Sequence, residues 1–123
     1  MKYTGSIITG QGRGKKLGFP TFNLKIPPHF PFKTGIYACW VWLNRTKYPG
    51  ALHFGPIPVF HQLDNHLEIH VLDCFTPAPT KTLIFEIVKF LRPIKNFPSP
   101  PALSHQIAID VTRIRKLLAS PDS

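Results

Sequence analysis

Short apolar runs, each followed by prolines or glycines, make up most of this chain. They have the length and the Val, Ile and Phe content of β-strands, and they cover Tyr3–Thr9, Ile36–Leu43, Tyr48–Phe54, Leu67–Cys74 and Thr82–Leu91. Most of the 14 prolines fall between these runs, at positions that no helix or central strand would accept. The pattern predicts an all-β fold, and many short strands joined in this way indicate a closed antiparallel barrel.

One segment near the C-terminus has helical spacing instead. Its apolar residues recur every three or four positions, at Leu103, Ile107, Val111 or Ile114, and Leu118. Ser99 is a good N-cap, and Pro100 suits the first helical position because an N–H there would have no helical partner. We predict one helix packed on the barrel, with the apolar stripe as ordinary core that has no cofactor role.

Length and composition indicate one domain. The 123 residues, 43% of them hydrophobic, suffice for one core, and neither a linker nor an internal repeat divides them. We expect a single domain over residues 1–123, ordered over 1–119 and frayed over 120–123. Cys39 and Cys74 lie in apolar runs and are predicted to be buried free thiols.

The sequence gives no sign of a membrane span, a signal peptide or a zinc site. No apolar run approaches the roughly 18 residues of a span, and the N-terminus lacks a long apolar stretch, so a cytoplasmic protein without a membrane partner is expected. His66 and His70 would share a strand face, but at about 3.3 Å per residue they would lie roughly 13 Å apart. That separation is too large for one zinc ion.

The chain is strongly basic. Fifteen Lys and Arg against six Asp and Glu give a formal charge of +9, a field that attracts anions such as ATP or nucleic acid. The basic residues recur along the whole chain and not on one helix. This spread favours a solvated basic surface over a dedicated nucleic-acid stripe.

The segment Gly10–Asn23 carries the most distinctive chemistry. Its first three glycines alternate with other residues, so backbone amides can turn toward one anion beside several basic side chains. It matches neither the dinucleotide fingerprint nor the Walker pattern. Thr21 and Asn23 would point their oxygens the same way on an extended segment, and such ligands suit Mg²⁺ bound to nucleotide phosphates. Composition alone also allows a basic loop without a ligand.

Glutamate is scarce in this chain, occurring only as Glu68 and Glu86. Within Leu67–Val71 the apolar residues alternate with Glu68 and His70, so the carboxylate projects from the opposite strand face. It could accept the proton of an attacking alcohol, which is the modest general-base help that phosphoryl transfer needs. His70 is a second candidate base, being of a residue type that titrates near neutrality. Glu86 is expected to be a surface or paired residue.

Five stretches, taken in order, resemble the signatures of the riboflavin kinases, or flavokinases, which phosphorylate riboflavin to FMN. They are GQGRGKKLGFPTFNL from Gly10, Gly35-Ile36-Tyr37-Ala38, Leu67–Asp73, Phe90–Phe97, and a closing helix with Gln106, Ile107, Asp110 and Arg115. Five ordered matches are far more specific than any one of them. The resemblance implies a six-stranded antiparallel Greek-key β-barrel with a C-terminal α-helix packed on it.

The resemblance also implies an activity, the magnesium-dependent in-line transfer of the ATP γ-phosphate to the ribityl 5′-hydroxyl of riboflavin. Glu68 would be the catalytic base, and Thr21 and Asn23 would hold Mg²⁺. ATP contacts are expected from Gly10, Gly12, Arg13, Gly14, Lys16, Gly18, Pro20, Thr21 and Asn23, and flavin contacts from Arg92, Lys95 and Phe97. The expected partners are riboflavin and ATP, with no nucleic acid, and FMN is the product. We expect a monomer, either a stand-alone kinase or a domain of a longer bifunctional chain.

The chain departs from the family pattern at several positions. Phe22, His53, Val59, Pro79 and Ile94 stand where the family has Ala, Asn, Thr, Tyr and Glu. These changes fit a divergent kinase, or alternatively a flavin- or nucleotide-binding barrel with weakened catalysis. A third alternative is a basic β-barrel that binds single-stranded nucleic acid by stacking bases on exposed aromatic residues.

Overall fold

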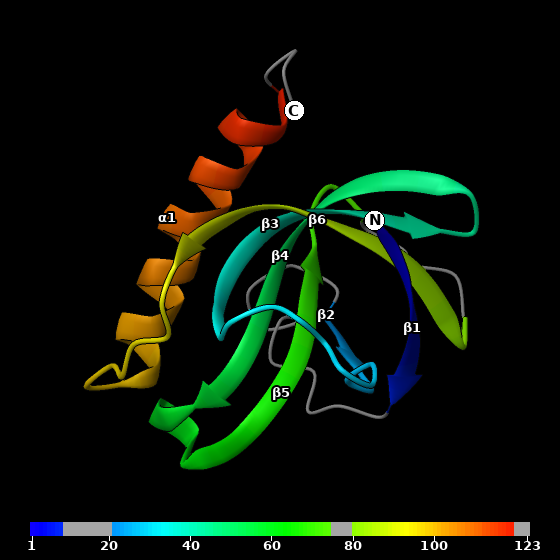
Figure 1. Cartoon of the computed structure of the whole chain (residues 1–123). Coiled ribbons are helices and arrows are strands. Elements are labelled where there is room, and N and C mark those ends of the chain that lie inside the picture. The colour runs from blue at the N-terminus through cyan, green and yellow to red at the C-terminus, as the bar shows by residue number, and fades with distance from the viewer. Residues whose placement is uncertain (9–20, 75–79, 120–123) are drawn as a thin grey trace.

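The computed structural model of the chain (Figure 1) describes residues 1–8, 21–74 and 80–119. Six strands form in these residues, namely β1 (Lys2–Ile8), β2 (Thr21–Leu24), β3 (Gly35–Leu43), β4 (Thr46–Ile57), β5 (Gln62–Val71) and β6 (Thr82–Arg92). One 3₁₀ turn spans Pro58–Phe60, and one α-helix, α1, spans Pro100–Ala119. No helix in the described residues is long and apolar enough to cross a lipid bilayer.

The strands pair antiparallel and close into a barrel in the order β1-β2-β5-β4-β3-β6. β3, β4 and β5 follow one another as neighbours, and β6 returns by a longer connection to lie beside β3. This arrangement is a Greek key. β1 then closes the barrel between β6 and β2. The predicted six-stranded barrel with one C-terminal helix is therefore confirmed.

The largest difference from the predicted strands is in β5. It begins at Gln62, five residues before the predicted start at Leu67, and its first part contains the exposed residues Leu63, Asp64 and Asn65. Gln62 and His66 on either side of them pair with the end of β4. Apolar alternation marks only the part of a strand that is buried on one face, so this exposed part gave no signal. β2 has four residues, and it provides the extended conformation predicted for Thr21 and Asn23.

Apolar side chains from all six strands, together with aromatic residues from the connections, fill the barrel. The most buried members include Leu52, Ile69, Val71 and Phe85. Phe30 closes one end by packing edge-on against Tyr3 and Phe54, with ring centroids 5.5 and 5.0 Å away. Gly50 is required in this interior, because a Cβ there would lie 2.8 Å from Val41 and 2.9 Å from Cys39. Cys39 and Cys74 are buried free thiols, as predicted, and burial raises the pKa of Cys39.

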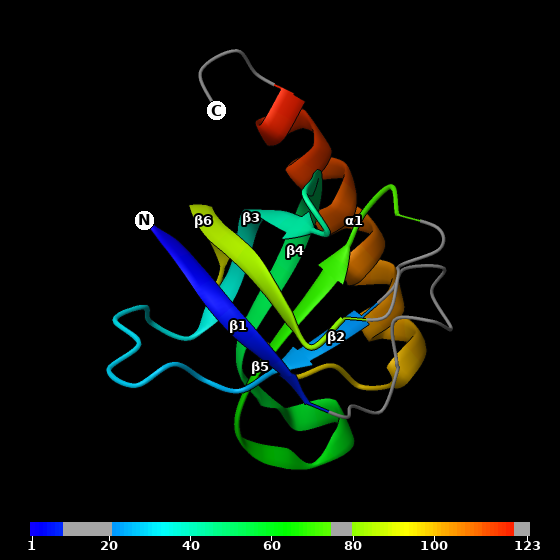
Figure 2. The same ribbon diagram turned by 90° about the vertical axis from the view of Figure 1, so that its right-hand side faces the viewer.

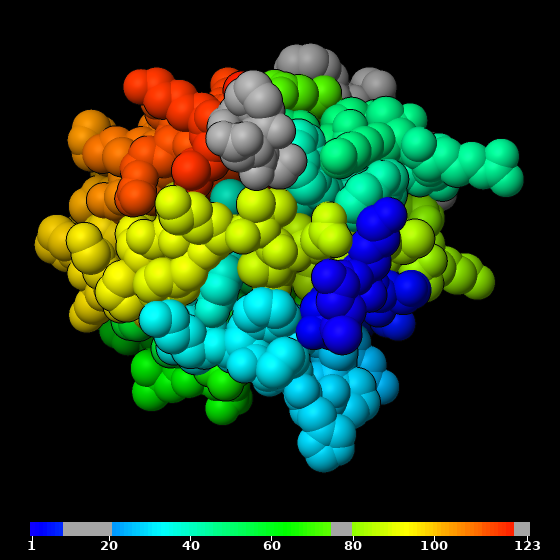
Figure 3. Space-filling model, turned by 45° about the horizontal axis from the view of Figure 1, so that its top comes forward, coloured from blue at the N-terminus to red at the C-terminus, as the bar shows by residue number. Residues whose placement is uncertain are grey.

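A second apolar cluster joins the outer face of the barrel to α1. Ile36, Ala38, Ala51, Leu72 and Leu91 from the barrel side pack with Val111, Ile114 and Leu118 of the helix. Figures 1 and 2 show the helix on one side of the barrel and β1 on the other. In Figure 3 the helix, coloured orange to red, lies beside the yellow end of β6. The C-terminal half of the predicted apolar stripe is therefore core, as expected.

Ser99 caps the helix as the sequence predicts. Its hydroxyl accepts a hydrogen bond from the Ala102 N–H at 3.3 Å, and its carbonyl accepts one from the Leu103 N–H at 3.2 Å. Both donors belong to the first helical turn, where N–H groups have no partner within the helix. The cap thus fixes the residue at which the helix begins.

Removing this cap should weaken the fold measurably. Ser99→Ala is expected to lower the free energy of unfolding by about 1 kcal/mol, because one helix N–H loses its acceptor. Thr112→Ala is the matched control, since its exposed hydroxyl bonds only to the Ala108 carbonyl within the same helix. Urea unfolding of both variants measures the difference. Equal stability of Ser99→Ala and the parent would contradict the capping role.

Candidate active site

The register of β2, β5 and β4 brings the predicted site residues together. Asn23 lies directly opposite Glu68, and Thr21 lies opposite His70. Directly opposed residues share a sheet face with Cβ atoms about 4.5–5.5 Å apart. On the far side of β5, Glu68 is opposite His53 of β4. Two adjoining rows of polar side chains therefore cross the outer face of the barrel.

This polar surface borders a cavity of about 330 Å³ between the barrel and the first half of α1. Its apolar walls are Ile36, Leu52, Ile57, Phe60, Leu103 and Ile107. Its polar lining includes Glu68, His70 and His53 from the barrel and Asp110 from the helix. A mostly apolar cavity of this size with a few convergent polar groups is typical of a small-molecule site.

Glu68 lies in this cavity with only 5% of its surface exposed. It is on the outer strand face, as its alternation with apolar residues predicts, and this face borders the cavity that α1 also lines. The Nε2 of His70 lies 3.2 Å from the Glu68 Oε1. A carboxylate only accepts hydrogen bonds, so Nε2 is the donor and the pair fixes the direction of the glutamate side chain. Glu68 and His70 thus act as one buried unit.

His53 stands next to Glu68, where the family pattern has asparagine. Its Nε2 lies 3.1 Å from the carbonyl oxygens of both Gly55 and Pro56, so Nε2 carries a hydrogen and donates it to them. Burial lowers the pKa of His53, while the Glu68 carboxylate and the two carbonyls partly oppose this. The imidazole therefore favours its neutral form beside the glutamate.

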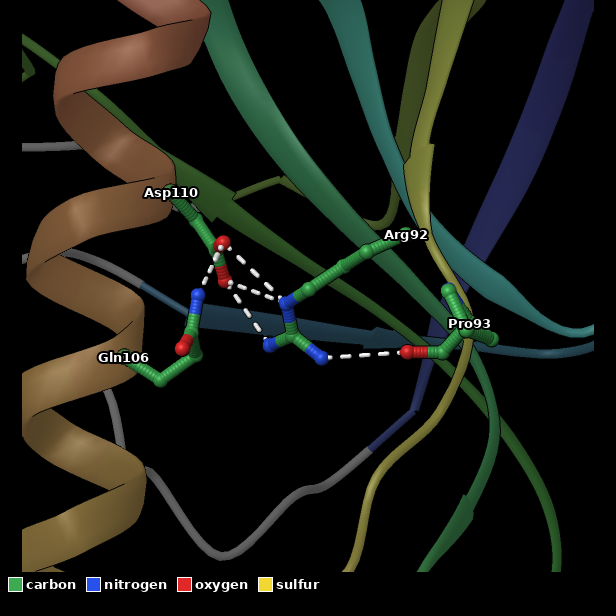
Figure 4. A network of polar contacts seen from close by, with 4 residues as sticks. All are labelled: Arg92, Pro93, Gln106 and Asp110. Atoms are coloured by element: carbon green, nitrogen blue, oxygen red, sulfur yellow. Dashed lines mark hydrogen bonds and ion pairs between the residues drawn. The ribbon is translucent and has the colours of Figure 1, made fainter.

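Arg92 holds the helix to the barrel (Figure 4). Its Nε donates to both carboxylate oxygens of Asp110 at 3.1 and 3.2 Å, and its Nη2 donates to Oδ2 at 2.8 Å. Its Nη1 donates to the Pro93 carbonyl at 3.2 Å, and Gln106 donates to Asp110 at 3.0 Å. Both charged groups are buried, at 8% and 2% exposure. Arg92 lines the cavity, as expected of a predicted flavin contact, but its guanidinium is engaged with protein acceptors.

The other predicted flavin contacts, Lys95 and Phe97, line a cavity of about 20 Å³. This small cavity shares Ile36, His53, Ile57, Arg92 and Leu103 with the large one, so the two adjoin. The Phe97 ring lies with its centroid 5.8 Å from the Arg92 guanidinium carbon. All three predicted flavin residues therefore lie around one region of the surface.

Two helix residues that the sequence assigns to ordinary core also line the large cavity. Leu103 and Ile107 are half-buried and face the space beside Glu68. Ile107 also packs against the helix–barrel cluster, as predicted. The place of both residues at the cavity could not be predicted, because apolar helical spacing is the same whether a side chain meets a strand or a ligand space. Asp110 was also missed as a pocket residue, although an acidic residue within the apolar stripe of a basic chain is a usable signal.

Two of the departures from the family pattern are explained by their packing. Phe22 points into the barrel, opposite Ile69, and so lies on the other strand face from Thr21 and Asn23. Its bulk is therefore placed in the core. Ile94 packs against the helix–barrel cluster. Val59 lines the small cavity.

The glycine-rich segment lies outside the described residues. The predicted ATP contacts Gly10, Gly12, Arg13, Gly14, Lys16, Gly18 and Pro20 all fall there, as does Pro79, and these assignments stay predictions. In the described part of the chain no group of three or more His, Cys, Asp or Glu side chains could hold a metal ion. The neutral oxygens of Thr21 and Asn23 suit Mg²⁺ that takes its remaining ligands from phosphates and water.

Known proteins give independent information about the family and the fold of this chain. The family model for riboflavin kinase, or flavokinase, matches residues 1–118. Human riboflavin kinase is 30% identical over 125 residues, covering 96% of this chain and 81% of its own length. In a solved riboflavin kinase from Trypanosoma brucei the same fold recurs, with a TM-score of 0.67 at 24% identity over 98% of this chain and 81% of that one.

Bacterial relatives are longer. The bifunctional riboflavin kinase/FMN adenylyltransferase of Pseudomonas fluorescens is 30% identical over 96% of this chain, which spans 38% of that protein. The RNA-binding riboflavin kinase RibR of Bacillus subtilis is 28% identical over 91% of this chain, which spans 49% of it. Because that relative is described as RNA-binding, the absence of a nucleic-acid partner stays a prediction here. The match of the family model over nearly the whole length nevertheless shows that this chain belongs to the riboflavin kinase family.

Proposed function

We propose that this chain is a riboflavin kinase that transfers the γ-phosphate of ATP to the ribityl 5′-hydroxyl of riboflavin and so forms FMN. The observation that carries the proposal is the direct pairing of Asn23 with Glu68 at the polar edge of the cavity. Asn23, which can ligate a metal through its amide oxygen, and Glu68, the candidate base, thus lie on the same face of the sheet, within reach of one substrate. Membership of the family supports the same reaction.

The cavity has the character that riboflavin needs. The flavin ring is flat and largely apolar, and the walls formed by Ile36, Ile57, Leu103 and Ile107 offer it apolar surface. The ribityl chain carries hydroxyl groups, and the polar lining around Glu68 and His70 offers acceptors. We therefore place the ring along the helix side and the ribityl chain toward β5.

Glu68 is the proposed general base. Its carboxylate accepts the proton of the 5′-hydroxyl as that oxygen forms a bond to the γ-phosphorus, while the bond from the γ-phosphorus to the bridging oxygen breaks and ADP leaves. The hydrogen bond from His70 holds the carboxylate in one direction. His70 is the weaker candidate for the base itself, because its Nε2 is already used by Glu68.

Thr21 and Asn23 are the proposed magnesium ligands, through their hydroxyl and amide oxygens. When bound, Mg²⁺ would neutralise part of the charge on the ATP phosphates. Both side chains are half-buried on the strand face that carries Glu68 and His70. The chain therefore offers oxygen ligands beside the base without adding another negative charge.

Asn23→Ala tests this metal assignment. The variant is expected to need at least about tenfold more Mg²⁺ for half-maximal FMN formation, because a lost metal contact weakens metal affinity by that order. Asn65→Ala is the matched control, since Asn65 is exposed on the distal part of β5. FMN is separated from riboflavin by chromatography while Mg²⁺ is varied.

The same assay decides between the proposed enzyme and the weakened binding module. FMN and ADP formed in equal amounts by the parent support the kinase. Riboflavin binding without FMN at any Mg²⁺ concentration would favour the module. An unchanged Mg²⁺ requirement in Asn23→Ala would reject Asn23 as a ligand and leave the kinase intact.

A further inference from the structure

His70 has two ring nitrogens in different situations. The residue is buried, with 7% of its surface exposed, and it lines the large cavity. Its Nε2 bonds to Glu68 at 3.2 Å. Its Nδ1 is buried and has no hydrogen-bond partner among the described residues. Buried polar atoms are normally paired, so this one points to a partner that comes from outside the protein.

The pairing with Glu68 determines what kind of partner Nδ1 takes. Because the carboxylate can only accept, Nε2 carries a hydrogen, and in the neutral form of the imidazole this is the one ring hydrogen. Nδ1 is then a bare acceptor, and it needs an O–H or N–H donor. A phosphate oxygen without a hydrogen cannot serve. The ligand group that meets Nδ1 is therefore a hydroxyl or an N–H group.

The described neighbouring groups do not supply this donor. Thr21 lies directly opposite on β2, but no hydrogen bond joins it to Nδ1. The directly opposed residue on β4 is Ala51, which has no polar side chain. The Nε2 hydrogen of His53 is donated to two carbonyls, and the Arg92 guanidinium donates to Asp110 and Pro93. The Nδ1 acceptor thus has no partner among the described residues, and His70 itself belongs to the cavity lining.

We propose that His70 positions riboflavin, its Nδ1 accepting a hydrogen bond from a ribityl hydroxyl while its Nε2 hydrogen orients Glu68. This inference rests on the proposed function. One imidazole would then link substrate and base, so that the ribityl chain and the carboxylate are held in one fixed relation. The ribityl chain is favoured over the flavin N–H because Nδ1 lies one ring width from the base, where the reacting end of the substrate must be. His70 is a positioning residue and not the base.

Two substitutions separate the two halves of this role. His70→Gln places an amide N–H near the position of Nε2 but has no acceptor at Nδ1, whereas His70→Asn keeps an acceptor near Nδ1 and loses the donor to Glu68. Binding is measured by quenching of flavin fluorescence, with riboflavin and with lumiflavin, which has the same ring system without the ribityl chain. Rates of FMN formation are measured alongside.

His70→Gln is expected to bind riboflavin about tenfold more weakly, the equivalent of one lost hydrogen bond, and to keep its lumiflavin affinity. His70→Asn is expected to keep the riboflavin affinity of the parent. Its kcat should fall, because Glu68 loses the hydrogen bond that orients it. In the parent, one ribityl deoxy analogue should bind more weakly than riboflavin, and that difference should vanish in His70→Gln. The analogue series on the parent needs no variant to fold.

Other outcomes overturn the proposal. An equal loss of riboflavin and lumiflavin binding in His70→Gln would mean that His70 only supports the fold. Unchanged riboflavin binding in that variant, or deoxy analogues that all bind the parent as riboflavin does, would show that Nδ1 meets no ribityl hydroxyl. These outcomes can be distinguished from a failure of the proposed function, because in that case the parent itself would form no FMN.

Discussion

Glu68→Gln is expected to lower kcat for FMN formation by about a hundredfold or more, the usual contribution of a positioned general base. Glutamine has nearly the same shape as glutamate, and its amide oxygen can still accept the hydrogen bond from His70 that the structure places at 3.2 Å. Riboflavin affinity should therefore change little. Single-turnover phosphorylation followed by chromatography separates the chemical step from binding.

Glu86→Gln provides the matched control, because Glu86 is the second of the two glutamates. It lies on β6 at the surface, 3.6 Å from the N-terminal amine, and is absent from the cavity lining. Its replacement should leave kcat within about twofold, since an exposed ion pair contributes little. Equal activity of Glu68→Gln and the parent would reject Glu68 as the base.

Asp110→Ala is expected to lower the free energy of unfolding by about 3–5 kcal/mol, because it leaves the buried Arg92 charge without its partner. The pair joins α1 to β6 through three hydrogen bonds. Loss of the pair should therefore also loosen the helix that covers the cavity and weaken riboflavin binding. Urea unfolding and flavin fluorescence measure the two effects.

Asp73→Ala is the control for this substitution. It breaks the Arg115–Asp73 ion pair, which has the same distance of 2.8 Å but lies at the surface, with side chains 48% and 55% exposed. Such pairs contribute about 1 kcal/mol or less. If both variants lost the same stability, burial would not be the reason for the strength of the Arg92–Asp110 pair.

The barrel and the strand faces of its polar residues could be predicted because they follow from local patterns. Alternation around Glu68 showed which strand face it occupies, and the two-residue spacing of Thr21 and Asn23 did the same for β2. The pairing of Asn23 with Glu68 could not be read from these patterns. It depends on the register between β2 and β5, in which the paired residues Asn23 and Glu68 are 45 positions apart in the sequence. Such a register is set by the long-range closure of the barrel.

The cavity itself was beyond prediction for a similar reason. Leu103 and Ile107 have the spacing of core residues, and only the position of α1 on the barrel leaves space beneath them. That position depends on the helix–barrel cluster and on the buried Arg92–Asp110 pair, whose members are 18 residues apart in sequence and give no periodic signal. Phe22 shows the converse case, since its bulk looked relevant to the metal site but points into the core.

The most direct test of this account is a crystal structure of the chain with riboflavin, ADP and Mg²⁺. We predict the flavin ring against Leu103 and Ile107, the 5′-hydroxyl within hydrogen-bond distance of Glu68, and Mg²⁺ on the oxygens of Thr21 and Asn23. A flavin bound on another surface, with the cavity between α1 and the barrel empty, would contradict the account.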